Sequence, residues 1–274
     1  MIVLKKINHN ALLADDNGVE KIAMGKGIGF SAEINQEFPA EKADKIFVLD
    51  SEEKTKLFAQ LVSEIPLEFI EFSEEIIRYI KTNIQGALDS NIYITLTDHV
   101  YFAIRRRGEN SNIAAIMIPE MKLLYPDEFN VASAVVQQIN QKYGTELDDN
   151  EAGFILMHIL NAQHGDKNSL NNLKILEMSK FILDTVNEES KTPLDQNSMK
   201  YHRFLVHVKF LTKRIVYREP FHDVPLDFLD PRFKETERYQ IARSVADKLH
   251  KRYGVEMSPI EIDYLAIHLT TLGA

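Results

Sequence analysis

The feature that most constrains the fold of this chain is an internal repeat. Residues 129–159 (FNVASAVVQQINQKYGTELDDNEAGFILMHI) align without gaps with residues 239–269 (YQIARSVADKLHKRYGVEMSPIEIDYLAIHL), at an offset of 110 residues. The identical pairs include Tyr143 with Tyr253 and His158 with His268. Solenoid repeats have periods of about 20–50 residues. The longer offset therefore predicts a duplicated domain, for which a chain of 274 residues has room.

A second duplicated histidine lies upstream in each copy. DHVYFAIRR (98–106) matches VHVKFLTKR (206–214) at an offset of 108, and both contain His-Val-x-Phe-x-x-x-Arg. The small change of offset fits an insertion or deletion in a loop. One histidine in an apolar run, such as GFILMHIL (153–160), is usually a core residue with satisfied ring nitrogens. Duplication at matched positions instead favours a function for four histidines, namely His99, His158, His207 and His268.

Each copy is predicted to be an all-helical bundle, because the pattern becomes helical from Ser51 onward. Helices are expected at 73–88 (opened by a capping Ser73), 92–106, 129–143, 149–162, 172–187, 198–216, 237–252 and 259–272. The polar loop 161–172 marks the boundary between the two bundles.

The last helix of each copy begins with a capping pattern. Ser258, Pro259 and Glu261 are typical of an N-cap, a first helical position and a capping box, and Asp148 and Glu151 stand at the same places in the first copy. Each glutamate precedes its histidine by seven residues, about 10 Å along the helix axis. We therefore interpret the two glutamates as helix caps and not as partners of the histidines.

The first fifty residues differ from the rest. The short segments 2–7, 11–14, 20–25 and 45–49 are rich in β-branched or apolar residues and are separated by turn signals. They predict a small antiparallel sheet, and a unit of this size buries little core alone, so we expect it to form a dimer. GKGIGF (25–30) has alternating glycines, which fit either a simple turn or the close approach of a ligand.

Composition narrows the function classes. The absence of cysteine excludes disulfides and thiolate metal sites. No apolar run is long enough to insert into a membrane, and we expect a cytoplasmic protein. No H-E-x-x-H or Gly-x-Ser-x-Gly motif is present, so no metal, cofactor or enzymatic activity is expected. A net charge of −9 argues against a nucleic-acid partner, but residues 1–30 hold four lysines against three acids.

KKINHNALLA followed by MGKGIGF resembles the start of the BglG/LicT/SacY transcriptional antiterminators. LTDHVYFAIRR, GFILMHILNAQ, HRFLVHVKFLTKRI and YLAIHL are similar to their two PTS regulation domains (PRDs), and the resemblance spans essentially the whole chain. It implies a multidomain α+β protein with a CAT RNA-binding domain at 1–55, a first PRD at 65–168 and a second at 171–274. His9 stands where relatives usually have Asn, and Lys26 where they usually have Arg, which removes a bidentate contact.

The resemblance also implies the function and the site residues. A homodimer would hold a hairpin of the leader mRNA and so prevent termination of a sugar operon of the β-glucoside or sucrose type. The implied RNA contacts are Lys5, Asn8, Asn10, Gly25, Lys26, Gly27 and Phe30. The four histidines would accept phosphate, His99 and His158 from a sugar-specific PTS enzyme II and His207 and His268 from HPr.

Two other function classes remain open at this point. A DNA-binding activator with the same regulatory domains would carry a helix-turn-helix in front of them, where this chain predicts strands. A histidine-dependent hydrolase would require converging acids or a metal, and the spacing of the histidines offers neither.

Overall fold

The structure is a computed structural model, and it describes residues 1–106, 117–163, 170–190, 194–196, 198–219 and 230–272. The chain divides into two compact units. The first contains residues 1–115 and 127–167, and the second contains residues 116–126 and 168–274. The middle of the loop predicted to separate the two bundles, residues 164–169, lies outside the described residues.

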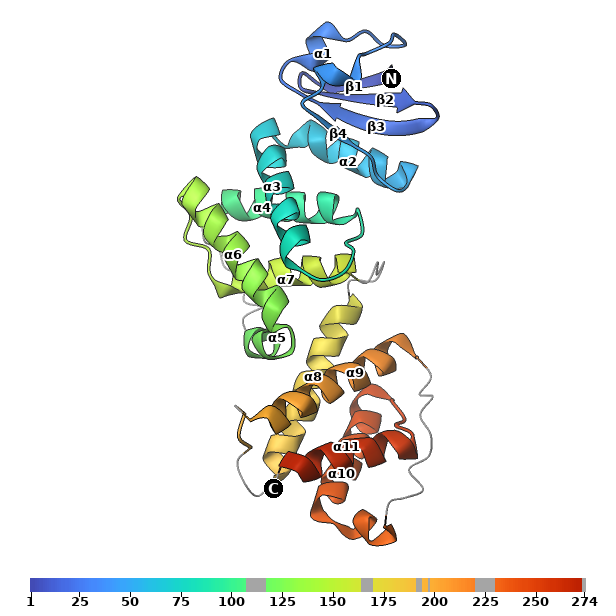
Figure 1. The fold of residues 1–274 in the computed structure, drawn as a ribbon, viewed down its shortest axis with the longest axis vertical. Helices are drawn as coiled ribbons and strands as arrows, with labels where there is room; N and C mark the ends of the chain where they lie inside the picture. The colour runs from blue at the N-terminus through green and yellow to red at the C-terminus, as the bar shows by residue number, and fades with distance from the viewer. Residues whose placement is uncertain (107–116, 164–169, 191–193, 197, 220–229, 273–274) are drawn as a thin grey trace. The chain divides into compact units, whose positions relative to one another are not determined.

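The first unit begins with a four-stranded antiparallel sheet in the order β1-β2-β3-β4 (Figure 1). Its strands are β1 (Ile2–Asn8), β2 (Ala11–Asp16), β3 (Val19–Met24) and β4 (Lys45–Phe47). Asn17 and Gly18 both have positive φ and form the two-residue turn between β2 and β3, as an Asn-Gly pair in a hairpin favours. The sheet confirms the predicted small β domain and occupies the segment where a DNA-binding activator would place a helix-turn-helix.

Helices cover both faces of this sheet. On one face Val3, Leu12 and Ala23 pack with Ile28 of the short helix α1 (Ile28–Ser31) and with Phe38. On the other face Ile22, Met24 and Phe47 pack with Phe58 and Val62 of α2 (Glu52–Glu64), which Ser51 caps. The sheet therefore completes its core within the chain, because α2 supplies the apolar surface that fifty residues alone would lack.

The first helical bundle follows, with α3 (Leu67–Asn83), α4 (Ile92–Arg106), α6 (Pro126–Tyr143) and α7 (Asp149–Gln163). The predicted start of α3 was wrong. The helix begins after Pro66, and Ser73 is fully buried in its interior instead of capping it. Pro66 provides the start because its fixed φ and missing N–H suit a helix terminus.

The second unit contains α8 (Leu170–Glu189), α9 (Met199–Tyr217), the 3₁₀ turn η3 (Pro231–Glu235), α10 (Glu237–Tyr253) and α11 (Pro259–Leu272). Both repeats thus form helical bundles, as predicted. None of the described helices is long and apolar enough to span a membrane.

The second unit also contains α5 (Ile118–Leu124), whose sequence lies within the range expected for the first PRD. Met121 and Leu124 are buried, and α5 packs on α8 and α9. Lys180 of α8 pairs with Glu120 at 2.6 Å, and Lys209 of α9 donates to the carbonyl oxygen of Leu124 at 2.9 Å. The compact units and the sequence repeats therefore do not coincide at α5.

Candidate nucleic-acid interface and histidine pairs

Two loops of the sheet domain are bonded together by their backbones. Gly25 N–H donates to the carbonyl oxygen of Asn10 at 2.9 Å, and Gly29 N–H donates to that of His9 at 2.9 Å. A Cβ at Gly29 would lie 2.3 Å from the carbonyl oxygen of Asn8, and Gly27 has a φ of +72°. The alternating glycines therefore allow the 25–30 loop to lie directly on the turn between β1 and β2.

The two asparagines of that turn have different surroundings. The side chain of Asn8 is used at both ends, because Nδ2 donates to the carbonyl oxygen of Val62 in α2 at 2.8 Å and Oδ1 accepts from Asn10 N–H at 2.8 Å. Asn10 Oδ1 accepts from Gly27 N–H at 2.8 Å. Over the described ranges no hydrogen bond uses Nδ2 of Asn10. Asn8 thus connects the turn to α2, whereas the side-chain amide of Asn10 keeps a donor that no hydrogen bond of the described residues uses.

The outer surface of the two loops carries exposed aromatic and basic groups. The Phe30 side chain is 71% exposed and its ring stacks on that of His9, with centroids 4.4 Å apart and planes 15° apart. Lys5 and Lys26 are exposed as well. Asp44, which the sequence did not single out, accepts a hydrogen bond from the backbone N–H of Lys26 at 3.1 Å and so helps to fix the loop.

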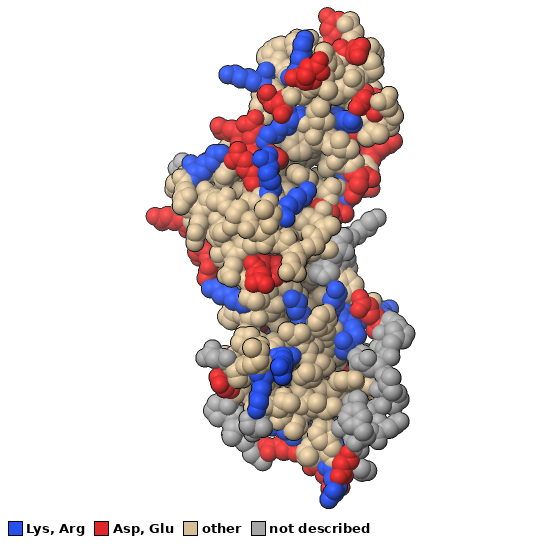
Figure 2. Space-filling view, viewed as in Figure 1, with Lys and Arg blue, Asp and Glu red and all other residues tan. Residues whose placement is uncertain are grey.

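The face of the molecule shown in Figure 2 has no continuous basic groove. On the face shown in Figure 2, basic and acidic side chains are interspersed over both units. Such a surface suits recognition by shape, hydrogen bonds and ring stacking better than tracking of a phosphate backbone.

The first pair of predicted histidines comes together from α4 and α7. The rings of His99 and His158 lie 4.9 Å apart between centroids, and both side chains are half-buried. Burial and the nearby His99 lower the pKa of His158 to about 3, so its ring is neutral at pH 7. Phe102, one turn after His99 on α4, is 61% exposed beside this pair.

The interpretation of Glu151 as a helix cap was wrong. Glu151 is buried, and its Oε1 lies 2.7 Å from Nε2 of His99, while its Oε2 accepts from Nη2 of Arg106 at 3.0 Å. The spacing along α7 separates Glu151 from His158, but His99 belongs to α4 and contacts both of them. A partner on another helix is not visible in the spacing of one helix.

The second pair comes from α9 and α11. The rings of His207 and His268 stack with centroids 4.3 Å apart and planes 26° apart. Burial, followed by the nearby His268 and Arg214, lowers the pKa of His207 to about 3, and burial also lowers the pKa of His268. Phe210, the counterpart of Phe102, is 54% exposed. The structure thus places all four predicted histidines in two equivalent pairs.

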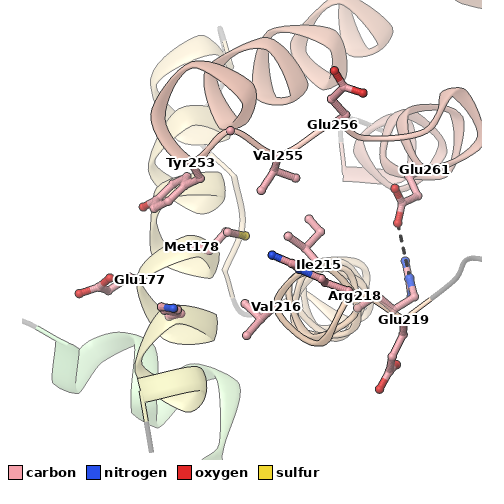
Figure 3. Close-up of a pocket in the computed structure, with 13 residues that line it drawn as sticks. Glu177, Met178, Ile215, Val216, Arg218, Glu219, Tyr253, Val255, Glu256 and Glu261 are labelled. Atoms are coloured by element: carbon pink, nitrogen blue, oxygen red, sulfur yellow. Dashed lines mark ion pairs between the residues drawn. The ribbon is translucent and has the colours of Figure 1, made fainter. Parts of the chain in front are cut away.

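Here the glutamate is a cap, as predicted. Glu261 Oε2 accepts from the backbone N–H of Ser258 at 3.1 Å, and Glu261 N–H donates to the Ser258 hydroxyl. Its Oε1 lies 3.6 Å from Nε of Arg214, the ion pair drawn as a dashed line in Figure 3. Among the ion pairs of the described residues, none joins Glu261 to a histidine.

A cavity of about 780 Å³ lies beside this ion pair. Met178, Ile215 and Val255 lie around its centre in Figure 3, whereas Glu177 and Glu256 point away from it. Neither histidine lines it. In the part of the chain that the structure describes, no cluster of three or more His, Asp or Glu side chains could hold a metal ion.

Comparison with protein-family models matches the sheet domain and each of the two repeats. Residues 1–56 match the model of the CAT RNA binding domain, and residues 74–162 and 180–272 each match that of the PRD domain. The chain is 31% identical over 273 residues to "Transcription antiterminator LicT" of Bacillus subtilis, covering 98% of both chains. It is 31% identical over 277 residues to "Beta-glucoside operon antiterminator" of Dickeya chrysanthemi, covering 98% of this chain and 95% of that one.

Among solved structures, the "Crystal structure of GlcT CAT-PRDI" matches 59% of this chain and 97% of its own, with 33% identity and a TM-score of 0.49. The family models and the full-length relatives agree with the sheet domain, the two bundles and their order. This chain therefore belongs to the family of transcription antiterminators in which a CAT RNA binding domain precedes two PRD domains.

Proposed function

We propose that the chain binds a hairpin of a leader mRNA through the surface formed by the β1–β2 turn and the 25–30 loop. The observation that carries the proposal is the fixed geometry of these loops, which leaves the Phe30–His9 ring pair, Lys26 and the Asn10 amide for a ligand. Lys5, Gly25 and Gly27 belong to the same loops or the strand beside them. Exposed rings and amide donors are suited to unpaired or distorted RNA.

Asn8 contributes to this site differently from the other proposed contacts. Its side-chain amide is already bonded to Val62 and Asn10, so it holds the turn against α2. We therefore assign Asn8 to the support of the RNA-binding loop, and the direct contacts to Asn10, Lys26 and Phe30.

The RNA test uses the full-length chain and a leader hairpin from its own operon. N10A is expected to weaken binding at least tenfold, because the free amide donor and the bond to Gly27 are both lost. N83A is the matched control, since Asn83 is exposed at the end of α3. Equal affinities of N10A and N83A for the hairpin would contradict the proposal. Failure of the wild-type chain to bind any hairpin of the operon would contradict it as well.

The regulatory proposal concerns the two histidine pairs. His99, His158, His207 and His268 accept phosphate, the first two from a sugar-specific PTS enzyme II and the last two from HPr. A neutral imidazole is a competent nucleophile, and each pair lies at a half-exposed surface next to an exposed phenylalanine. The added phosphate brings nearly two negative charges to sites that already hold charged groups, Glu151 and Arg106 at the first pair and Arg203 and Arg214 at the second.

The test incubates the full chain with HPr, enzyme I, the enzyme II and labelled phosphoenolpyruvate. The label should be acid-labile and alkali-stable. Replacement of both histidines of one pair should remove the part of the label that this pair carries. H250A provides the control, because His250 is exposed on α10 and belongs to neither pair. Retention of the full label after replacement of all four histidines would contradict the proposal.

The active form is proposed to be a cytoplasmic homodimer that regulates a sugar operon. Its support is the exposed apolar surface of the edge strands, Ile2 and Leu4 on β1 and Ile46 on β4, and Phe102 and Phe210 beside the histidine pairs. A β-glucoside operon is the first candidate, since one relative is named for such an operon. Sedimentation of the chain with and without phosphorylation measures the dimer directly.

A further inference from the structure

The two histidine pairs are equivalent in sequence but differ in the partner of one histidine. In the first pair Nε2 of His99 lies 2.7 Å from Oε1 of Glu151. In the second pair the corresponding Glu261 is held by Ser258 and Arg214, and the described ion pairs include none between it and His207. The first pair therefore has a carboxylate at a histidine nitrogen and the second does not.

The residue before each helix explains the difference. Ser258 supplies a backbone N–H and a hydroxyl, and both engage Glu261 in a capping box. Asp148 stands in this place in the first copy, and its own carboxylate accepts from the backbone N–H of Asn150 at 3.0 Å. A second carboxylate is repelled from that cap, so Glu151 turns to the cations and donors of α4.

A buried carboxylate requires compensation, and Glu151, whose side chain is 4% exposed, obtains a hydrogen bond from Arg106 at Oε2. Its Oε1 lies 2.7 Å from Nε2 of His99; this contact lacks hydrogen-bond geometry, and neither buried atom has another hydrogen-bond partner among the described residues. A carboxylate oxygen can only accept, so a proton on Nε2 is favoured there. The tautomer of a histidine is fixed by the partner of one ring nitrogen, and the other nitrogen then keeps its lone pair.

We propose that Glu151 positions His99 for phosphoryl transfer by holding the proton on Nε2, so that His99 accepts the phosphoryl group on Nδ1. The inference rests on the proposed function of the histidine pairs and assigns the first pair a chemistry that the second lacks. Glu151 is a positioning residue, since it acts through His99.

The transfer can be written with every bond accounted for. The lone pair on Nδ1 of His99 attacks the phosphorus of a phosphorylated side chain on the donor protein. The bond between the donor atom and phosphorus breaks, and its electron pair returns to the donor atom. The new phospho-imidazole of His99 carries positive charge with its proton on Nε2, and the carboxylate of Glu151 lies opposite that charge.

The first test needs no phosphoryl donor. Nitrogen-15 NMR of the full-length chain with labelled histidine distinguishes the two tautomers, and the His99 signal is identified by its loss in H99Q. We expect His99 to carry its proton on Nε2 at pH 7.5, and E151A to give a mixture of tautomers. A wild-type His99 with its proton on Nδ1 would overturn the inference, whatever the behaviour of the variants.

The second test examines the phosphorylated chain, with His158, His207 and His268 replaced by Gln so that only His99 accepts. Coupling between phosphorus-31 and nitrogen-15 should place the phosphate on Nδ1. E151A should lower the phosphorylation rate at least tenfold and E151D should restore part of it, whereas E261A, the matched control, should leave it unchanged. Phosphate on Nε2, or an unchanged rate in E151A, would overturn the inference and leave the proposed function intact. Absence of phosphate from all four histidines of the wild type would overturn both.

Discussion

The stacked rings of His9 and Phe30 form an exposed aromatic surface on the loops that we propose to bind RNA. Stacking of a base on an aromatic side chain is worth about 1–3 kcal/mol. We expect F30A to lose binding free energy in this range. H9A should lose about 1 kcal/mol, or roughly fivefold in affinity, because the His9 ring stacks on the Phe30 ring and holds it in place. Fluorescence anisotropy with the leader hairpin at fixed salt measures both. Wild-type affinity of H9A would show that the ring of His9 adds nothing.

The pKa of His158 makes a prediction about stability. Burial and His99 hold it at about 3 in the folded chain, against an ordinary value of about 6.5 in the unfolded chain. Between these values the unfolded state binds more protons, so stability falls as the pH drops from about 6.5 toward 3. At pH 5 the loss amounts to about 2 kcal/mol for this one group.

Urea unfolding of the wild type and of H158Q at pH 7.5 and pH 5 checks this expectation. Glutamine is polar but does not titrate, so H158Q should lose about 2 kcal/mol less than the wild type between the two pH values. Equal losses would mean that His158 is protonated in the folded chain and that its burial is unimportant.

Among the helices, α2 is the one that completes the sheet domain. Phe58 is 1% exposed and packs with Phe47, whereas its neighbour Leu57 is 49% exposed. F58A should therefore destabilise the first unit by about 3–5 kcal/mol, and L57A should change it by less than about 0.5 kcal/mol. For the same reason a fragment of residues 1–65 should fold and bind the hairpin. A fragment of residues 1–55 should be less stable, because it lacks Phe58 and Val62 and so cannot complete this core. Circular dichroism of the two fragments and thermal unfolding of the two variants measure the difference.

The short helix α5 provides a second prediction at this scale. Met121 is buried against the second unit although its sequence belongs to the first PRD range. M121A should cost about 2–5 kcal/mol and raise hydrogen exchange in α8 and α9 while leaving α3 protected. N130A, at an exposed position of α6, is the control. Loss of protection in α3 and not in α8 would contradict the assignment of α5 to the second unit.

At the scale of the whole molecule, we expect phosphate on the first histidine pair to inactivate the protein and phosphate on the second pair to support its active dimer. H158D should mimic part of a phosphate charge on the first pair and depress antitermination, whereas H268D should not depress it. Readthrough of a reporter placed behind the leader terminator provides the measurement. Equal depression by both variants would remove the proposed difference between the two PRDs.

The sequence by itself determined the duplication, the four histidines at matched positions of the two copies, the β-rich start and the family. These features follow from periodicity and from matched positions, which depend only on spacing along the chain. The cap formed by Ser258 and Glu261 was predictable for the same reason, since all its bonds lie within one turn of one helix.

Only the tertiary structure decided which side chains meet across elements. Asn8 is bonded to α2, Glu151 turns from its own helix to His99 on α4, and α5 packs in the second unit. Each of these contacts joins segments far apart in the sequence, and it depends on how helices cross and which buried polar groups must be compensated. Spacing along one helix contains neither quantity, so the glutamate that looked like a cap in both copies is a histidine partner in one.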